Sequence, residues 1–356
     1  MITFNDSVIG ALEFTVSWEK DGISHVEWFL GRKLNPVNDI FPRGMREALE
    51  GKKAGESVAF TYEPRMCIPR FKETLVELHP LRNLRPKTFQ GRPIIPQIGR
   101  FYPQGFIFYK RDNNSDNLTP FRLTNTDDTN FSADCNHPLA NVPVTIEAKI
   151  QYLEKRETGT FGSLTHWREK TCDWGPGMQA QHDGQPTDFF HDAFFDRRDA
   201  IDTPFTPPTV DATAHDNFKK LFAQFLKPKM RVLDLSATLS IPPKGKYDAA
   251  LCTLSIEYMP DPITTLKAVK DHLKPGGIIL IGFTNHYDKN HVIQGWIDLH
   301  EFERMGLVMD YLRQAELDTN AGTISKRNDW RPQDDPHFIE TRGVSDPVYV
   351  VYGHKS

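Results

Sequence analysis

The stretch Met230–Leu254 (MRVLDLSATLSIPPKGKYDAALCTL) decides the fold of the C-terminal half. Its two ends, Met230–Ser236 and Tyr247–Leu254, are short apolar runs that predict two strands of a nucleotide-binding α/β sheet. Such folds hold their ligand with a glycine-rich turn after the first strand and an acidic residue about 20 residues further on. Here that turn lacks glycine, and only thirteen residues separate Asp234 from Asp248. The sequence therefore predicts an enzyme-like fold that lacks the residues with which such folds bind their cofactor.

Length and composition limit the class of protein. The chain has 356 residues, enough for two or more domains, and its net charge of −4 gives no general signature of nucleic-acid binding. It has no apolar run long enough to cross a membrane and no secretory signal pattern at the N-terminus. The four cysteines (Cys67, Cys135, Cys172 and Cys252) are too widely spaced to predict a zinc site or a disulfide framework. We therefore expect a soluble, cytoplasmic protein that binds neither nucleic acid nor membrane.

Residues 1–153 are expected to be rich in β-structure. Alternating apolar runs predict strands at Ala11–Trp18, Val58–Tyr62, Gly105–Tyr109, Thr119–Thr124 and Val142–Leu153. A short amphipathic helix closed by glycine is predicted at Gly44–Gly51. The stretch between Pro64 and Ala133 is rich in proline, arginine and asparagine, and it predicts a subdomain inserted between two strands of a host barrel.

The amino-acid composition and the expected secondary structure change twice after residue 153. Residues 154–211 are rich in glycine, proline, aspartate, histidine and aromatic residues, so we expect a loop-rich linker whose phenylalanines partly pack down. Helices and strands follow from residue 212. We expect helices at Asp216–Phe225, Pro262–Leu273 and Val292–Met305, and strands at Ile278–Phe283, Met309–Leu312 and Val348–Tyr352.

Two N-terminal segments carry a family resemblance. Phe41–Gly55 (FPRGMREALEGKKAG) and Cys135–Ala140 (CNHPLA), in this order, resemble the pocket-floor helix and the return segment of FKBP-type peptidyl-prolyl isomerases of the SlyD kind. The stretch from Ile68 to Ser132 lies where that family places its insert-in-flap chaperone domain. The resemblance implies an α+β FKBP-like barrel or sheet formed by residues 1–67 and 133–153, with residues 68–132 as the inserted β subdomain.

The resemblance also implies an apolar pocket that binds a prolyl side chain and twists its amide. Its residues would be Phe41, Pro42, Met45, Met66 and Ile146. Pro42 stands where the family holds the substrate carbonyl with a backbone N–H, which proline lacks. Because such a hydrogen bond is worth about 1 kcal/mol net, we expect weak or absent isomerase activity with peptide binding retained. Alternatively, Phe41, Met45 and Ile146 are ordinary core residues of a barrel that packs a helix.

The insert offers a second candidate surface. Aromatic and basic side chains alternate along it: Phe101, Tyr102, Phe106 and Phe108 beside Arg85, Arg92 and Arg100. This mixture suits a flexible or unfolded peptide, so we expect the aromatic residues to bind a protein or peptide client. The alternative is a small ordinary core with a solvated basic face.

The C-terminal region carries another resemblance. Arg231–Leu235 (RVLDL), Tyr247–Leu251 (YDAAL) and His272–Gly277 (HLKPGG) resemble class I S-adenosylmethionine-dependent methyltransferases, and Leu299–Val308 (LHEFERMGLV) is similar to one subgroup. A βαβ unit takes about 30 residues or more, so two strands of the family's sheet are missing before Tyr247. In the order 3-2-1-4-5, strands 1 and 4 are neighbours. The resemblance therefore implies a truncated but contiguous α/β Rossmann-like domain at residues 212–356.

The missing strands would have carried the ribose-binding acid and the adenine wall, so we expect no cofactor. S-adenosylmethionine would be possible only through Asp234, Ser236 and Glu257, which lie at the ends of the two remaining strands. Asp234 could instead cap the next turn. Glu257 follows the second of these strands, at the edge of the sheet where chemistry usually occurs.

Histidine and aspartate residues of the linker are candidate metal ligands. They are His182, Asp183, His191, Asp192 and Asp196. Imidazole and carboxylate suit a divalent metal, but both also accumulate in solvated loops. We predict no metal site.

These patterns predict a client-binding folding helper or assembly factor fused to a degenerate methyltransferase-like domain. Two alternatives stay open. One is an active prolyl isomerase with an unusual pocket. The other is a methyltransferase completed by a partner subunit that supplies the missing half of the sheet.

Overall fold

The computed structural model describes residues 2–85, 93–108, 116–157, 164–181, 187–190, 194–196, 209–235 and 245–356. Its strands are β1 (Val8–Lys20), β2 (Ile23–Leu34), β3 (Ser57–Tyr62), β4 (Val76–Pro80), β5 (Phe101–Pro103), β6 (Pro120–Thr126), β7 (Asn130–Asp134), β8 (Val144–Lys155), β9 (Val232–Asp234), β10 (Tyr247–Thr253), β11 (Leu273–Phe283), β12 (Thr319–Arg327) and β13 (Val348–His354). Its α-helices are α1 (Met45–Leu49), α2 (Ala212–Ala223), α3 (Pro262–His272), α4 (Gln294–Asp298) and α5 (Glu301–Gln314).

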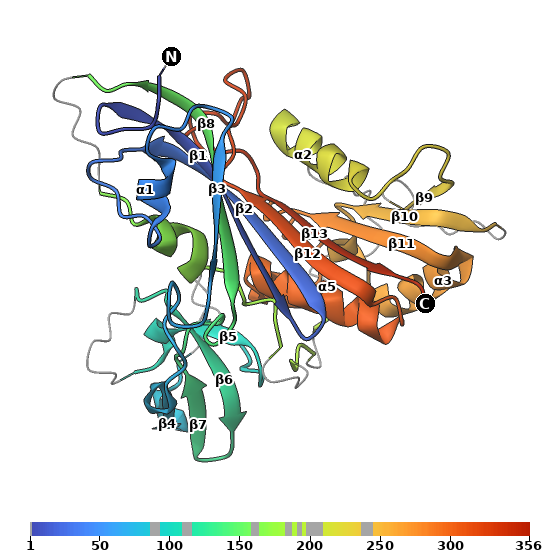
Figure 1. The fold of residues 1–356 in the computed structure, drawn as a ribbon. Coiled ribbons are helices and arrows are strands. Elements are labelled where there is room, and N and C mark those ends of the chain that lie inside the picture. The colour runs from blue at the N-terminus through green and yellow to red at the C-terminus, as the bar shows by residue number, and fades with distance from the viewer. Residues whose placement is uncertain are drawn as a thin grey trace.

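The strands form two sheets. A nine-stranded sheet has the order β3-β8-β1-β2-β12-β13-β11-β10-β9, and a four-stranded sheet has the order β4-β7-β6-β5. Figure 1 shows the large sheet running through the molecule, with the blue and green strands at one end and the orange and red strands at the other. The small sheet is the predicted insert, because its strands lie in the chain between β3 and β8.

The N-terminal strands have one buried and one polar face. In β1, Leu12, Phe14 and Val16 are buried, and Glu13 lies on the opposite face because side chains alternate along a strand. A two-residue turn connects β1 to β2 and includes Asp21, whose positive φ is typical of hairpin turns. Helix α1 packs beside β3, as Figure 1 shows, and its buried side chains join the same core as Phe14. The N-terminal region is thus largely β-sheet around a small apolar core.

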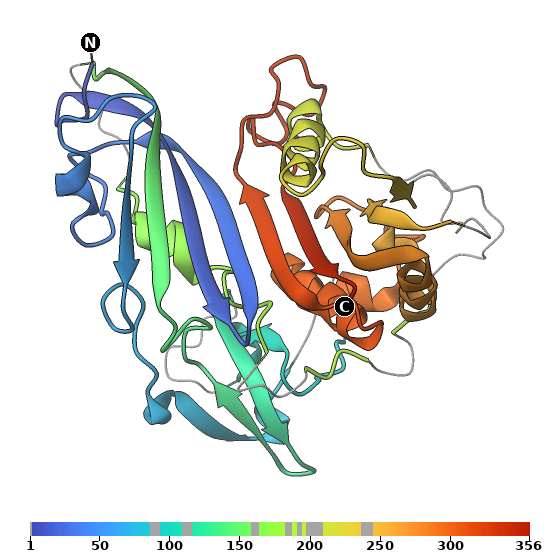
Figure 2. The same cartoon turned by 45° about the vertical axis from the view of Figure 1, so that its right-hand side comes forward.

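The C-terminal strands form a Rossmann-like layer. Strand β10 pairs in parallel with β9 on one side and with β11 on the other, whereas β13 is antiparallel to β11. The prediction that the shortened sheet stays contiguous is therefore confirmed. Helix α2 packs on one face of this layer, and α3 and α5 belong to the core on the other face, as Figure 2 shows.

The two regions meet within the large sheet. Strand β2 pairs in parallel with β12, from Ser24 opposite Gly322 to Phe29 opposite Arg327. Across this junction the guanidinium of Arg327 forms an ion pair with Glu27, whose side chain is 1% exposed. Burial lowers the pKa of Arg327 to about 10, so it stays charged at neutral pH. The sequence predicted two domains joined by a linker and did not predict a shared sheet.

The insert is also held against the C-terminal region. Arg100 and Glu303, 1% and 3% exposed, form an ion pair of 3.5 Å, and Arg100 donates a second hydrogen bond to the Asp298 carbonyl. The backbone N–H of Phe101 donates to Glu303 at 2.9 Å. These bonds fix the β5 end of the small sheet to the first turn of α5.

Three predicted elements differ from the structure. The helix expected at Val292–Met305 is divided into α4 and α5, because a capping box starts α5 at His300. Met309–Leu312, expected as a strand, continues α5 and lies on its buried side. Gly105–Tyr109 is not a strand in its described part, where a 3₁₀ turn spans Gln104–Phe106; Tyr109 lies outside the described residues. No helix in the described part of the chain is long and apolar enough to span a bilayer.

The junction pair gives a stability prediction. Replacing Glu27 with alanine leaves Arg327 as a buried charge without its counter-charge, which should lower the free energy of unfolding by about 3–5 kcal/mol. Denaturant unfolding would measure the change. The control is Glu340→Ala, at a side chain that is 79% exposed, where we expect a change within about 0.5 kcal/mol. Equal effects of the two substitutions would contradict the role of the buried pair.

Candidate functional site

The predicted pocket of the N-terminal region is filled by the linker. Met45 and Ile146 are both 0% exposed and share a core with Trp167 of the linker. The Trp167 ring stacks on Phe14 with centroids 5.3 Å apart, and its indole N–H donates to Asp39 Oδ2 at 2.9 Å. Trp167 is thereby fixed in the same core as Met45 and Ile146.

The other pocket residues are not brought together around an opening. Pro42 is buried, Phe41 is half-buried, and Met66 is 48% exposed. Met45 and Ile146 are core residues here, which is the alternative that the sequence left open. In this conformation a peptide has no access to either side chain.

The aromatic residues of the insert form its interior. Phe101 and Tyr102 are 6% and 3% exposed, and Phe106 packs against the same cluster with its ring 6.5 Å from that of Tyr102. Phe108 is half-buried, with the Arg85 guanidinium 4.0 Å from its ring centroid. The expectation that these four rings face a client is therefore wrong for Phe101 and Tyr102, because the four-stranded sheet needs them as its core. Arg92 lies outside the described residues.

Different apolar side chains of the insert are exposed. Val76 and Leu78 on β4 are 41% and 70% exposed, and both point to the same face because they are two residues apart. Ile95, Ile98 and Leu118 are 56%, 40% and 51% exposed. The sequence signal for β4 was the alternating run Val76–Pro80 (VELHP), which the strand predictions missed.

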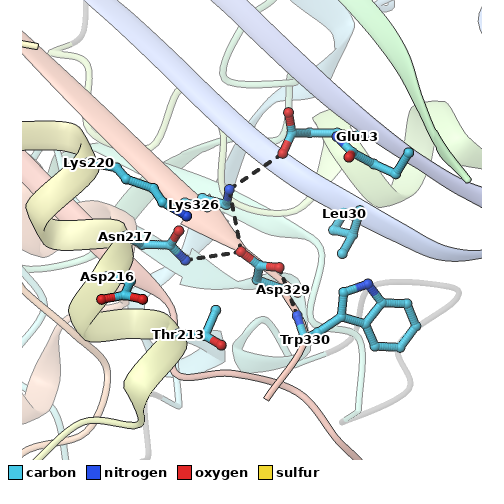
Figure 3. A pocket seen from close by; sticks show the side chains of 10 residues that line it. Glu13, Leu30, Thr213, Asp216, Asn217, Lys220, Lys326, Asp329 and Trp330 are labelled. Carbon is cyan, nitrogen blue, oxygen red and sulfur yellow. Dashed lines mark hydrogen bonds and ion pairs between the residues drawn. The ribbon is translucent and has the colours of Figure 1, made fainter. Parts of the chain in front are cut away.

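A cavity of about 310 Å³ lies between the polar face of the N-terminal strands and α2 (Figure 3). Its lining residues are Glu13, Leu30, Gln151, Thr213, Asp216, Asn217, Lys220, Lys326, Asp329 and Trp330. Lys326, at its centre, lies 3.4 Å from both Glu13 and Asp329, and the Asn217 amide donates to Asp329 at 3.0 Å. These bonds join β1, β12 and α2. The cavity is therefore a polar junction, and no sequence motif marked it because its residues are far apart in the chain.

The carboxyl edge of the Rossmann-like layer holds the candidate cofactor residues. Asp234 ends β9 and is exposed, whereas Ser236 lies outside the described residues. Glu257 lies in the 3₁₀ turn Ile256–Tyr258 that follows β10, and it is 1% exposed. Burial raises the pKa of Glu257 to about 8, against the opposing effects of a backbone hydrogen bond and the Arg304 charge. Glu257 is thus a neutral acid over much of the pH range in which an ordinary carboxyl is ionised.

Residues 192–318 match the family model of a methyltransferase domain. The match begins before α2 and ends at the residue before β12, so it includes β9, β10 and β11. The C-terminal region is therefore methyltransferase-like. A search of curated proteins gave no match.

The methyltransferase match leaves binding of S-adenosylmethionine possible, and the structure describes part of the edge where the cofactor would lie. Strand β9 is the last strand of the sheet in the described part of the chain, so no neighbouring strand presents an acid to a ribose. Glu257 points into the protein, and its Oε2 atom is buried without a hydrogen-bond partner among the described residues. Asp234 is exposed at this edge, and residues 236–244, which follow it in the chain, lie outside the described residues.

The metal candidates of the linker stay largely untested. His182, Asp183, His191 and Asp192 lie outside the described residues, and Asp196 is exposed. Within the described ranges, no group of three or more histidine, cysteine, aspartate or glutamate side chains is arranged to hold a metal ion.

Glu257 gives a pH prediction. The unfolded carboxyl loses its proton near pH 4.5, whereas the folded one keeps it up to about pH 8, so this residue makes stability fall as pH rises between those values. Between pH 4.5 and pH 8 this residue should lower the stability of the wild type by on the order of 4 kcal/mol. Glu257→Gln should lack this fall, so its stability relative to the wild type should rise by the same amount between the two pH values. Unfolding at both pH values measures the difference. Parallel stability curves for the two proteins would refute the assignment.

Proposed function

We propose that this chain is a SlyD/FKBP-like peptide-binding folding helper or assembly factor with weak or absent prolyl isomerase activity. Its methyltransferase-like domain would act as a scaffold and not as an enzyme. The observation that carries the proposal is the exposed apolar face of β4, at the outer edge of the insert.

Edge strands of soluble proteins are usually protected by charge, proline or a covering segment. Strand β4 contains Glu77 and Pro80, but its exposed face presents Val76 and the 70% exposed Leu78, and its order in the described sheet makes it an edge. An extended client segment can add to such an edge by backbone hydrogen bonds while its apolar side chains cover alternate residues. This mode of binding is tolerant of sequence, which suits a folding helper.

The scaffold role follows from how the insert is attached. Its β5 end is bound to α5 through Arg100 and Glu303, and β4 is at the opposite edge of the small sheet. Figure 1 shows β4 and β7 on the side away from the C-terminal helices. The methyltransferase-like domain therefore holds the insert with its client edge turned outward.

The N-terminal region supports the family resemblance and the low isomerase activity. A short helix precedes β3, a subdomain is inserted after β3, and the chain returns through β8 into the same antiparallel sheet. The resemblance implies this arrangement. Pro42 lacks the expected N–H, and Met45 and Ile146 are buried in the core that also contains Trp167. Each of these features lowers the expected catalytic rate.

Refolding of a proline-limited model protein tests the proposal. The wild type should reduce aggregation near equimolar amounts and leave the slow refolding phase unchanged. The double variant Val76→Asp/Leu78→Asp should lose most of this effect, because two charges prevent apolar contact along the edge. Ile339→Asp is the matched control, since this side chain is 88% exposed on the C-terminal region. A faster slow phase at substoichiometric amounts would instead show an active isomerase.

Calorimetry with S-adenosylmethionine tests the scaffold role. We expect no binding heat at high ligand concentration, because no strand lies beyond β9 in the described part of the chain to hold the nucleoside. Binding at micromolar concentration would favour the alternative in which the domain is a methyltransferase. The same titration with a partner subunit present would then decide whether that partner completes the site.

A further inference from the structure

A second cavity, of about 470 Å³, lies where the end of the β1–β2 hairpin meets the linker and α5. The hairpin turn contributes Asp21, the linker contributes Gln179, and α5 contributes Gly306 and Arg313. Gly306 lets the linker lie close to the helix, because a Cβ atom at this position would be 3.0 Å from the Gln179 carbonyl oxygen. The volume lies within the range of about 300–1,000 Å³ that is typical of small-molecule sites.

Two buried polar side chains line this cavity with atoms that have no hydrogen-bond partner. Gln179 is 7% exposed, and its Oε1 atom is buried without a partner in the described part of the chain. His25 is 2% exposed, and its Nδ1 atom lies 2.7 Å from the Thr323 hydroxyl oxygen. No residue in the described ranges bonds to the other ring nitrogen of His25. Because burying polar groups without partners is unfavourable, such groups indicate a place for a bound molecule.

The buried part of the lining carries no charge at neutral pH. Burial, followed by the charge of Lys20, lowers the pKa of His25 to about 3, so the imidazole stays neutral. Its ring is held by stacking on Trp18, with the centroids 5.1 Å apart. Here the cavity therefore offers an imidazole and the Gln179 carboxamide, which form hydrogen bonds to an uncharged polar group.

The outer part of the lining carries charges of both signs. Its cations are the half-buried Lys20 and Arg313, and Arg313 lies 3.5 Å from Asp310. Its anions are the exposed Asp21 and Asp318. Because the two cations and two anions of the lining balance, this part favours a ligand that itself carries both charges.

We propose that this cavity binds a free α-amino acid with an amide side chain. The α-carboxylate pairs with the cations Lys20 and Arg313, and the α-ammonium pairs with the two aspartates of the lining. The side-chain amide bonds to Gln179 and His25 and supplies the partners that these groups lack. The inference goes beyond the proposed folding-helper role and does not depend on client binding.

Saturation-transfer NMR of the full chain with free L-glutamine tests the site. We expect transfer to L-glutamine at millimolar concentration. N-acetyl-L-glutamine lacks the ammonium charge and L-leucine lacks the amide, so each should bind weaker by about tenfold or more. Absence of transfer to both L-glutamine and L-asparagine would overturn the proposal, and so would equal binding of L-leucine and L-glutamine.

Gln179→Leu distinguishes a binding role from a structural one. Leucine is apolar and of similar size, so L-glutamine should bind weaker by about tenfold or more. The free energy of unfolding should not fall, because the buried Oε1 atom has no partner to lose in the described part of the chain. The control is Gln333→Leu, at an exposed position, which should bind L-glutamine as the wild type does.

Arg313→Gln gives a second measurement at the outer part of the lining, where a substitution does not disturb the core. Loss of this cation should weaken L-glutamine binding by about tenfold, because the α-carboxylate loses a charged partner. Wild-type affinity in either Gln179→Leu or Arg313→Gln would show that the amino acid does not bind in this cavity.

Discussion

The parallel pairing of β2 with β12 is the contact on which the rest of the molecule depends. It converts four N-terminal strands and five C-terminal strands into one sheet, and the buried ion pair of Glu27 with Arg327 fixes its register. The pair is costly to break because either charge alone would remain buried. Once this register is set, the polar face of β1 lies against α2 and the insert reaches α5.

The Rossmann-like layer folds as a contiguous sheet although the short connection between β9 and β10 leaves no room for two of the family's strands. The strands that remain are neighbours in the family's sheet order, so each keeps its hydrogen-bonding partners. The domain keeps a large core around α5. The insert is bound to this helix through the ion pair between Arg100 and Glu303.

The sequence predicted what depends on local pattern and spacing. The gap between Asp234 and Asp248 was enough to predict the truncated, contiguous sheet, and the limits of α3 were nearly right because Asp261 and Pro262 mark its start. Predictions failed where burial comes from distant segments. Phe101 and Tyr102 are buried, and the sequence does not distinguish a client surface from a small core because both have the same mixture of aromatic and basic residues. The role of Trp167 had no local signal, and the family comparison reaches only the C-terminal region.

The junction strands come from opposite ends of the chain, and this sets the order of events during synthesis. Strand β2 lies within the first 40 residues and β12 begins at Thr319, so the N-terminal strands emerge long before the partner that completes them. Until then β2 is an unpaired edge with a row of open backbone groups. Contacts of such long sequence separation form late and slow the folding of the whole chain. A protein that we propose protects other chains therefore exposes, during its own synthesis, the kind of strand edge that promotes aggregation.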